Sequence, residues 1–249
     1  MTDSTEKKPN LSLFFPVYND QTTVERITDK SIKVLNQIAD EYEILIIDDG
    51  SPDKSGEIAD QLAQKYSYVK VIHHEKNMGY GAAIKTGFKN CRYEIICFTD
   101  GDDEYDVFDF LKMIKLIHYY DLIITFRYVK LYSGYRQFLS WFYNKLLKIL
   151  FQSPYRDIST GLRLIKKNVV DELDLISDSP FIGAEITIKT MLKGHPVGEV
   201  GIQTFPRKFG KGASTSFKNI IATMKDMLKV HKKIFCTEYE KPQIDLLKN

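Results

Sequence analysis

The sequence predicts a single α/β domain with a mostly parallel central sheet, and two features of the chain support this. Short apolar runs rich in β-branched residues alternate with longer segments of helical periodicity through the first half. Strand, helix and strand in repeated order form parallel sheets with helices on both faces, so a three-layer sandwich is expected. The 249 residues, 43% of them hydrophobic, suffice for one large core.

The first half contains four expected strands and several expected helices. The strands are at residues 11–15, 43–47, 69–72 and 94–99, and the run EILII at 43–47 is the clearest buried strand. Helical spacing predicts helices at residues 22–39, 53–66 and 81–89, with another starting near Val107. Because no linker or repeat interrupts the chain, we expect one domain at 11–216, a polar tail at 1–10, and a C-terminal helix and tail at 217–249.

The second half contains two long apolar segments with helical spacing. In residues 137–151, a helix buried against the sheet accounts for one stripe, formed by Leu139, Phe142, Leu146 and Ile149. A helix lying on a bilayer accounts for a second stripe, formed by Phe138, Trp141, Lys145 and Lys148. Both interpretations stay open. In residues 217–235, a buried face is expected from Ile220, Ile221, Met224, Leu228 and Ile234.

The formal net charge of +2 conceals a division between the two halves. Residues 1–125 carry 22 acidic and 14 basic side chains, whereas residues 126–249 carry 11 acidic and 21 basic. This asymmetry favours a charged ligand or partner, although two oppositely charged solvated faces would give the same counts. The acidic loops and the lack of a known binding module argue against nucleic acid.

The composition also indicates the compartment. Three cysteines, Cys91, Cys97 and Cys236, form neither a disulfide framework nor a zinc-binding pattern. The polar N-terminus lacks the apolar core of a signal peptide, and no uncharged apolar stretch approaches the roughly 18–20 residues of a membrane span. We therefore expect a cytoplasmic protein, either soluble or peripheral at the cytoplasmic face of a membrane.

Acidic residues are concentrated directly after the strand at 94–99. Five acids occur in residues 100–106, where Asp100 and Asp102 flank Gly101. Ligands bind beyond the carboxyl ends of the strands in parallel sheets, so this pair lies where chemistry is expected. Carboxylates without His or Cys favour Mg²⁺ or Mn²⁺. A solvated acidic turn that caps the next helix is the simpler alternative.

The loops after the first two strands carry further candidates. Tyr18 is suited to stack on a base, and Asp20 to accept a hydrogen bond from it. Asp48 and Asp49 follow the strand at 43–47 and are suited to accept from a nucleobase or ribose. A helix cap at Ser51 or Asp53 explains this second loop equally well.

Two further features indicate anion binding. The segment NMGYG opens the helix at 81–89, where amides can meet an anion, but Ile84 in place of a third glycine argues against a NAD site. There is no Walker A sequence, which argues against an ordinary kinase. The basic half supplies side chains suited to grip phosphate, namely Arg127, Arg136, Arg163, Arg207, Lys208 and Lys211.

The segments FFPVYND, IIDDGSPD, NMGYGAAIKTGF and FTDGDDEYD, in this order and at these intervals, resemble family 2 glycosyltransferases with the GT-A fold. The likeness continues through ITFRYVK, DISTGLRLI, GAEITIK and PRKFGKGAS, which are similar to the branch that transfers sugars to dolichyl and polyprenyl phosphates. It covers about residues 11–216. By this resemblance, 11–125 is the nucleotide-binding half and 126–216 the acceptor half.

The resemblance implies roles for the matching residues. A nucleotide sugar, either a GDP- or a UDP-hexose, would be held by Pro16, Tyr18, Asp20, Asp48, Asp49, Gly79, Lys85, Asp100 and Gly101. Mg²⁺ or Mn²⁺ would be held by Asp100, Asp102 and Glu104. The acceptor phosphate would be held by Arg127, Arg136, Arg163, Arg207, Lys211 and Ser214. Roles in catalysis are implied for Asp102, Arg127, Asp157 and Glu185.

The implied reaction is inverting transfer of a hexose to a polyprenyl phosphate. A phosphate acceptor needs no strong base, whereas a hydroxyl acceptor would need Glu185 or Asp157. The alternatives are transfer to a hydroxyl of a glycan, protein or small molecule, and a non-catalytic subunit that binds sugar nucleotides.

The chain departs from the family pattern in two respects. Asp103 and Glu104 replace a Gly-Gln or Leu-Gln pair that is often present. Many relatives continue into transmembrane helices, whereas a soluble or peripheral form, or one with a membrane partner, is expected here.

Overall fold

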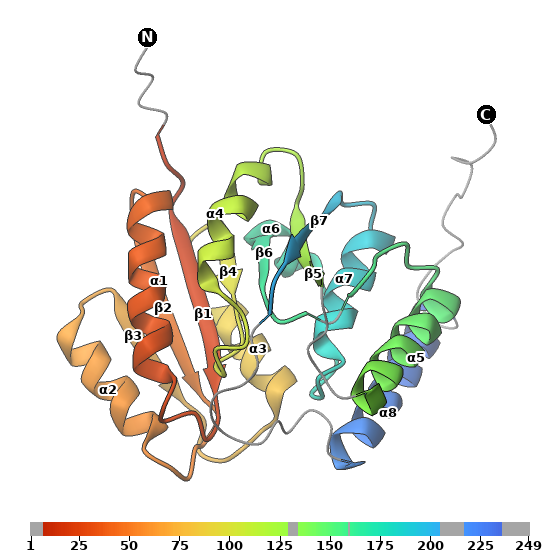
Figure 1. Ribbon diagram of the computed structural model, residues 1–249, viewed down its shortest axis with the longest axis horizontal. Coiled ribbons are helices and arrows are strands. Elements are labelled where there is room, and N and C mark those ends of the chain that lie inside the picture. Colours follow the sequence, from red (N-terminus) through yellow and green to blue (C-terminus); the bar gives the residue numbers. More distant parts are fainter. Residues whose placement is uncertain (1–6, 129–133, 159, 205–216, 236–249) are drawn as a thin grey trace.

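A computed structural model describes residues 7–128, 134–158, 160–204 and 217–235. Within these residues the core is a seven-stranded sheet in the order β3-β2-β1-β4-β6-β5-β7 (Figure 1). Its strands are β1 (Leu11–Val17), β2 (Tyr42–Asp48), β3 (Val69–His73), β4 (Ile95–Phe98), β5 (Leu122–Arg127), β6 (Arg163–Lys166) and β7 (Val197–Ile202). All neighbouring strands are parallel except β6, which runs antiparallel to β4 and β5. The predicted mostly parallel sheet is confirmed.

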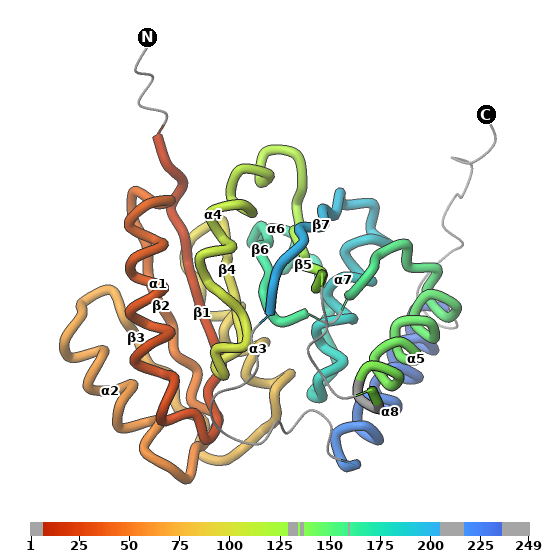
Figure 2. The backbone as a smooth tube through the Cα atoms, viewed as in Figure 1, coloured from red at the N-terminus to blue at the C-terminus, as the bar shows by residue number. Residues whose placement is uncertain are grey.

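Helices cover both faces of the sheet and complete the three-layer sandwich (Figure 2). One side holds α1 (Val24–Ile38), α2 (Ser55–Lys65) and α4 (Phe110–Met113), with the 3-10 turns η1 (Val107–Asp109) and η2 (Ile114–Leu116). The other side holds α3 (Tyr80–Asn90), α5 (Gly134–Phe151), α6 (Lys167–Glu172), α7 (Ile182–Leu192) and α8 (Phe217–Lys233).

The central strands contribute to the cores on both sides of the sheet. Leu13 and Phe15 of β1 lie in the core beneath α1 and α2. Phe14 between them lies in the opposite core, where it stacks on Phe98 of β4 with ring centroids 5.3 Å apart. Every residue of β1 is buried, as expected for a parallel strand with helices on both faces. This two-sided burial explains the continuous apolar runs in the sequence.

The elements predicted for the first half are present, with ends shifted by one or two residues. The helix expected near Val107 begins as the turn η1, and the Asp106 side chain accepts a hydrogen bond from the Phe108 amide at 3.2 Å. Asp106 therefore acts as the predicted acidic cap. In the second loop, Asp53 accepts from the Ser55 amide at 3.0 Å, although Lys54 occupies the N-cap position of α2.

Of the two interpretations left open for α5, full burial of the stripe through Phe142 and Ile149 is not observed, although Leu146 of that stripe packs partly against the core. Phe142 and Ile149, which were expected inside, are 51% and 67% exposed, whereas Leu147 and Phe151 are buried. The reason is that α5 lies at the flank of the molecule beside α8 (Figure 1), and its buried residues share a core with Met227 of that helix.

The predicted face of α8 is corrected in the same way. Ile221 and Leu228 are 40% and 59% exposed, while Met227, Val230 and Ile234 form the buried face. Ile234 is thus the residue of the predicted stripe that is fully buried, and Met224 packs partly against the same core. In the part of the chain that the structure describes, no helix combines the length and the apolar character required to cross a membrane.

Candidate functional site

The loops that follow β1, β2 and β4 meet at the carboxyl edge of the sheet. The Thr23 hydroxyl donates to the backbone oxygen of Gly101 at 2.6 Å and so joins the first loop to the acidic loop after β4. The Gln21 amide donates to Asp53 at 3.2 Å and so joins the first loop to the second. The sequence prediction that these loops form one site is consistent with this arrangement, because parallel strands end at the same edge.

Asp100 and Asp102 lie half-buried in the loop after β4. The Tyr80 hydroxyl donates to Asp100 Oδ1 at 2.6 Å, and the Glu104 amide donates to Asp102 Oδ1 at 3.0 Å. Between them, Gly101 lies so close to the Pro16 carbonyl that a Cβ would overlap it. Pro16 and Gly101, both predicted to bind nucleotide, therefore fix the path of the acidic loop against the first loop.

The other acids of the loop have different contacts from those of Asp100 and Asp102. Asp103 has a positive φ of +57° and pairs with Arg26 and Lys30 of α1, at 2.7 Å and 2.9 Å. Asp106 caps η1, and Glu104 is 5% exposed. The repulsion expected among five neighbouring acids is thus relieved by cations of α1. Asp103, one of the two residues that depart from the family pattern, thus directs its side chain toward α1.

The donor set of the loop fits a hard divalent cation. Asp100 and Asp102 supply carboxylate oxygens, and Mg²⁺ is commonly bound by one or two carboxylates together with substrate phosphates. Among the residues described, no group of three or more His, Cys, Asp and Glu side chains is arranged to hold a metal. Glu104 is buried beside the pair, and its part as a third ligand stays a prediction. The remaining ligands would come from a diphosphate and water.

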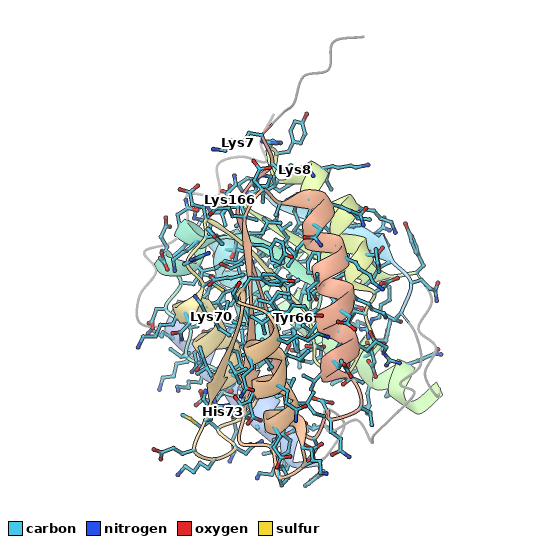
Figure 3. The ribbon with its side chains drawn as sticks, turned by 90° about the vertical axis from the view of Figure 1, so that its left-hand side faces the viewer. Lys7, Lys8, Tyr66, Lys70, His73 and Lys166 are labelled. Atoms are coloured by element: carbon cyan, nitrogen blue, oxygen red, sulfur yellow. The ribbon has the colours of Figure 1, made fainter. Side chains whose placement is uncertain are left out.

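Asp48 and Asp49 act as acceptors within the protein. Asp48 is bound by the Ser51 amide at 3.0 Å and by His73 Nδ1 at 2.8 Å. The hydrogen bond to Asp48 is the largest influence on His73 and raises the pKa of this histidine above its usual value. Figure 3 shows His73 and Lys70 along β3, the edge strand.

Asp49 connects β2 to the start of α3. Its Oδ1 accepts from the Met78 amide at 2.8 Å and lies 2.7 Å from His74 Nδ1, while its Oδ2 accepts from the Gly79 amide at 2.9 Å. Asp49 is 3% exposed. Its visible role is to hold this turn, and a contact with the nucleoside stays a prediction.

Tyr18 is the exposed aromatic residue of the first loop. Its side chain is 41% exposed, and its amide donates to Asp20 Oδ2 at 3.0 Å. The Asp20 amide in turn donates to the Ser55 hydroxyl at 2.9 Å. Tyr18 is thus held by its backbone while its ring is open to solvent, as a stacking platform for a base requires.

The N-terminus of α3 approaches the acidic loop. Gly79 has a φ of +98°, which favours glycine, and the next residue is Tyr80. Burial and the nearby charge of Asp100 raise the pKa of Tyr80 well above its usual value, so its hydroxyl stays a donor. Lys85, another predicted nucleotide ligand, instead pairs with Asp178 at 2.6 Å.

Arg127 ends β5 and forms a buried ion pair with Asp157. The Arg127 Nε and Nη2 atoms lie 2.8 Å and 2.6 Å from Asp157 Oδ2, and the two side chains are 10% and 3% exposed. The structure therefore brings these two predicted site residues together. Asp157 is engaged as the ion-pair partner of Arg127, and its catalytic role stays a prediction.

Glu185 does not lie in an open site. It is fully buried on α7, accepts from the Ile176 and Ser177 amides at 2.9 Å each, and lies 2.7 Å from Lys189 Nζ. The prediction of a catalytic role for Glu185 is corrected to a structural one, because a buried and fully engaged carboxylate cannot reach an acceptor.

Arg163 is also structural in this arrangement. Its side chain is fully buried at the start of β6 and donates to the carbonyl oxygens of Thr160, Gly183 and Ile158 and to the Thr187 hydroxyl. Burial lowers its pKa, and neighbouring groups that include Tyr80 and Asp100 oppose that effect. The predicted direct contact of Arg163 with an acceptor phosphate is not supported, because the side chain is fully buried and four of its five N–H donors are used within the protein.

Several predicted residues lie outside the described part of the chain. These are Arg207, Lys211 and Ser214, and likewise the side chain of Arg136. Their proposed contacts with phosphate stay predictions.

Sequence reasoning missed two residues beside Asp100. Tyr80 was noted only for the glycines around it, and Gly161 carries no local signal. A Cβ on Gly161 would overlap the Asp100 carboxylate.

The seven-stranded, mostly parallel sheet with helices on both faces is the fold of GT-A glycosyltransferases. The structure is similar to that of glucosyl-3-phosphoglycerate synthase from Mycobacterium tuberculosis, crystallised with Mn²⁺, uridine diphosphate and phosphoglyceric acid, with a TM-score of 0.69. That match has 16% sequence identity and covers 90% of this chain and 78% of the other. A crystal structure of the same enzyme with Mg²⁺ and uridine diphosphate has a TM-score of 0.68.

The family follows from the sequence comparison. Residues 12–174 match glycosyl transferase family 2, and the chain belongs to this family. It is 25% identical over 231 residues to an undecaprenyl-phosphate 4-deoxy-4-formamido-L-arabinose transferase of Photorhabdus laumondii, covering 90% of this chain and 69% of the relative.

Two further relatives match over shorter spans. The enzyme of the same name from Pseudomonas fluorescens is 28% identical over 66% of this chain, which spans 48% of that relative's length. The uncharacterized glycosyltransferase EpsJ of Bacillus subtilis is 39% identical over 38% of this chain and 26% of its own length.

Proposed function

We propose that this glycosyltransferase moves a hexose from a GDP- or UDP-sugar to a polyprenyl phosphate, with inversion and with Mg²⁺ or Mn²⁺. The observation that carries the proposal is the half-buried Asp100–Asp102 pair, held beyond β4 against the loop that presents Tyr18. The names of the two undecaprenyl-phosphate sugar transferases support the lipid phosphate as acceptor.

In the proposed mechanism, Asp100 and Asp102 hold the divalent ion beside the donor diphosphate. The bound ion would neutralise charge on the departing nucleotide diphosphate. Tyr18 would stack on the base, and the buried contacts of Asp48 and Asp49 would keep the loops around it in place. The protein's own part is to orient the donor so that its anomeric carbon faces the acceptor.

The state of the candidate bases favours a phosphate over a hydroxyl acceptor. A hydroxyl has to lose a proton during attack, whereas a phosphate monoester is already largely ionised at neutral pH. Asp157 is paired with Arg127, and Glu185 is enclosed in the protein interior. With both candidates engaged, an acceptor that needs no base fits better. Arg127, at the end of β5, would help to hold the acceptor phosphate.

The outer faces of α5 and α8 support contact with a membrane, where such an acceptor is found. On α5 the exposed residues include Phe138, Trp141 and Phe142, and Lys145 lies 4.9 Å from the centre of the Trp141 ring. On α8, Phe217, Ile221 and Leu228 are exposed, and lysines flank them at positions 218, 225, 229 and 232. Exposed aromatic and aliphatic residues bordered by lysines are typical of helices that lie on anionic bilayers.

The proposed function is tested by a donor and acceptor screen. Purified protein is incubated with GDP- and UDP-hexoses, a polyprenyl phosphate and Mg²⁺ or Mn²⁺, and a lipid-linked sugar is scored by mass spectrometry. A parallel series replaces the lipid phosphate by the corresponding polyprenol, which has a hydroxyl in place of phosphate. Product with the phosphate and none with the alcohol is expected. Transfer to the alcohol alone would contradict the proposed acceptor.

A further inference from the structure

Asp100 is surrounded by three groups that the proposed reaction does not itself use. The Tyr80 hydroxyl donates to its Oδ1 at 2.6 Å. Gly161 lies against the carboxylate so closely that no side chain fits there. The buried guanidinium of Arg163 donates to the carbonyl oxygens of Ile158 and Thr160 and so holds the backbone that leads to Gly161.

The antiparallel strand β6 brings these groups to the acidic loop. In the register of the sheet, Arg163 lies opposite Phe98, two residues before Asp100, and its guanidinium carbon lies 5.8 Å from the centre of the Phe98 ring. Because β6 starts at the edge where β4 ends, the residues just before it, including Gly161, meet the residues just after β4.

Tyr80 is itself fixed from two directions. The Gly79 amide before it donates to Asp49 of the second loop, and the Gly81 amide after it donates to the Asp178 carbonyl at 2.9 Å. A Cβ on Gly81 would overlap the backbone at residues 177–178, so α3 and this segment are in tight contact. Glu185 holds that segment through the Ser177 amide.

We infer that Tyr80, Gly161 and Arg163 form a support cluster that fixes the orientation of Asp100 before any ligand arrives. A carboxylate that can rotate freely loses conformational freedom on binding a cation, whereas a carboxylate held by a hydrogen bond and by close packing loses less. The three are positioning residues, since they act through Asp100. This inference rests on the proposed function in one respect, namely that Asp100 binds the metal of the metal–nucleotide complex.

The test removes one hydroxyl group. Tyr80→Phe keeps the ring and deletes the donor to Asp100, and Mn²⁺ affinity is measured by electron paramagnetic resonance of free Mn²⁺ with uridine or guanosine diphosphate present. We expect Mn²⁺ to bind at least about tenfold more weakly, as is typical when a second-shell partner of a metal ligand is lost. Tyr42→Phe is the matched control, because it deletes a tyrosine hydrogen bond to Asn36 at the opposite end of β2.

A second variant tests the packing contact. Gly161→Ala places a methyl group where the Asp100 carboxylate lies, and we expect Mn²⁺ affinity to fall about as much as in Tyr80→Phe. Gly134→Ala is its control, since a Cβ there meets no atom of the described residues within 4 Å. Thermal unfolding of each variant identifies any general loss of folding, and the Tyr80→Phe result stands if Gly161→Ala fails to fold.

The outcomes separate the two proposals. Wild-type protein that binds Mn²⁺, with Tyr80→Phe binding it equally well, would overturn the support cluster alone. Wild-type protein that binds no Mn²⁺ with either nucleotide would overturn the metal role of Asp100 and, with it, the purpose assigned to the cluster. Weaker binding in Tyr80→Phe but not in Tyr42→Phe would support it, provided both variants unfold at the wild-type temperature.

Discussion

At the scale of single residues, neighbouring carboxylates of one loop have different environments. Asp102 stays half-buried at the edge of the sheet, whereas Asp103 turns to Arg26 and Lys30 of α1. The same chemical change at these two adjacent positions should therefore have different effects. This makes the pair a test of which acid does chemistry and which one stabilises the fold.

Asp102→Asn is expected to abolish sugar transfer and Mn²⁺-dependent nucleotide binding. The amide keeps the size of the side chain but removes the negative charge that a divalent cation needs. Transfer assays and calorimetric titration of nucleotide, with and without Mn²⁺, check this expectation. Full activity of Asp102→Asn, or full activity of the wild type without any divalent ion, would contradict the role.

Asp103→Asn is the matched control. Nucleotide affinity should change by less than about twofold, because Asp103 faces α1. Loss of the two partly exposed ion pairs should lower the free energy of unfolding by about 0.5–1 kcal/mol, and less at high salt. Asparagine tolerates the positive φ at this position, so no backbone strain is added.

Residue types and their order along the chain located the acidic pair but not its surroundings. The loop after a buried strand was sufficient to place Asp100 and Asp102 at the carboxyl edge. Glu185 and Arg163 were misassigned, because a charged residue in a motif looks the same whether its partners are a ligand or buried backbone amides and carbonyls. Only the tertiary contacts of Arg163 with Ile158, Thr160 and α7 distinguish these cases.

At the scale of elements, His195 connects the segments before β5 and β7 to the end of α6. Its Nδ1 lies 3.0 Å from Asp121, which precedes β5, and its Nε2 lies 3.2 Å from Glu172 at the end of α6. Asp121 also pairs with Lys166 of β6 at 2.8 Å. Burial alone lowers the pKa of His195, but the hydrogen bonds to both carboxylates outweigh it and raise the pKa above its usual value.

This histidine predicts a pH-dependent contribution to stability. Because the pKa of His195 is raised in the folded state, its full contribution to the free energy of unfolding is present below its unfolded pKa of about 6.5. This contribution is lost as the pH rises through the folded pKa. His195→Gln should therefore lower the free energy of unfolding by about 0.5–1 kcal/mol more at about pH 5.5 than at about pH 8.5. Urea unfolding at both pH values measures this difference.

His118→Gln provides the control, because His118 is an exposed histidine that precedes β5 in the chain. Its stability should follow that of the wild type at both pH values. An equal loss for His195→Gln at both values would show that the imidazole contributes by packing and not by charge.

The positions of α5 and α8 along the chain were predicted correctly, but the faces that they bury were not. A run that is apolar nearly all round contains several possible stripes, and periodicity alone does not say which one meets a neighbour. Phe151 packs against Phe181, the residue just before α7, with ring centroids 6.2 Å apart, and this contact selects the buried side of α5. The exposed aromatic residues of the interfacial interpretation are consistent with the structure, whereas the stripe through Ile149 is not buried.

At the scale of the whole molecule, the division of charge between the halves has a partial structural account. Acids of the first half occupy the edge of the sheet or pair with α1, and lysines of the second half line the exposed side of α8. We expect this basic and apolar flank to bind vesicles of anionic lipid. Trp141→Ala combined with Lys145→Glu should reduce sedimentation with such vesicles several-fold. The reason is that the variant removes one aromatic side chain from the bilayer surface and reverses one charge that attracts anionic lipid.

The control is a pair with the same spacing on another element. Tyr119 is 73% exposed, and Lys115 lies four residues before it near η2. Tyr119→Ala combined with Lys115→Glu changes the same kinds of side chain away from α5 and should leave vesicle binding unchanged. Wild-type protein that ignores anionic vesicles altogether would contradict the membrane contact.

The direction of β6 has a consequence for how the protein matures during synthesis. Both acids of the proposed metal pair lie in the first 102 residues, yet Gly161 and Arg163, which complete the surroundings of Asp100, come some 60 residues later. A nascent chain that has folded only β1 to β4 therefore holds the carboxylates without their support. The site is complete only when β6 enters the sheet antiparallel to β4, so acquisition of tight metal binding would report on the entry of β6 and not on the folding of β1 to β4 alone.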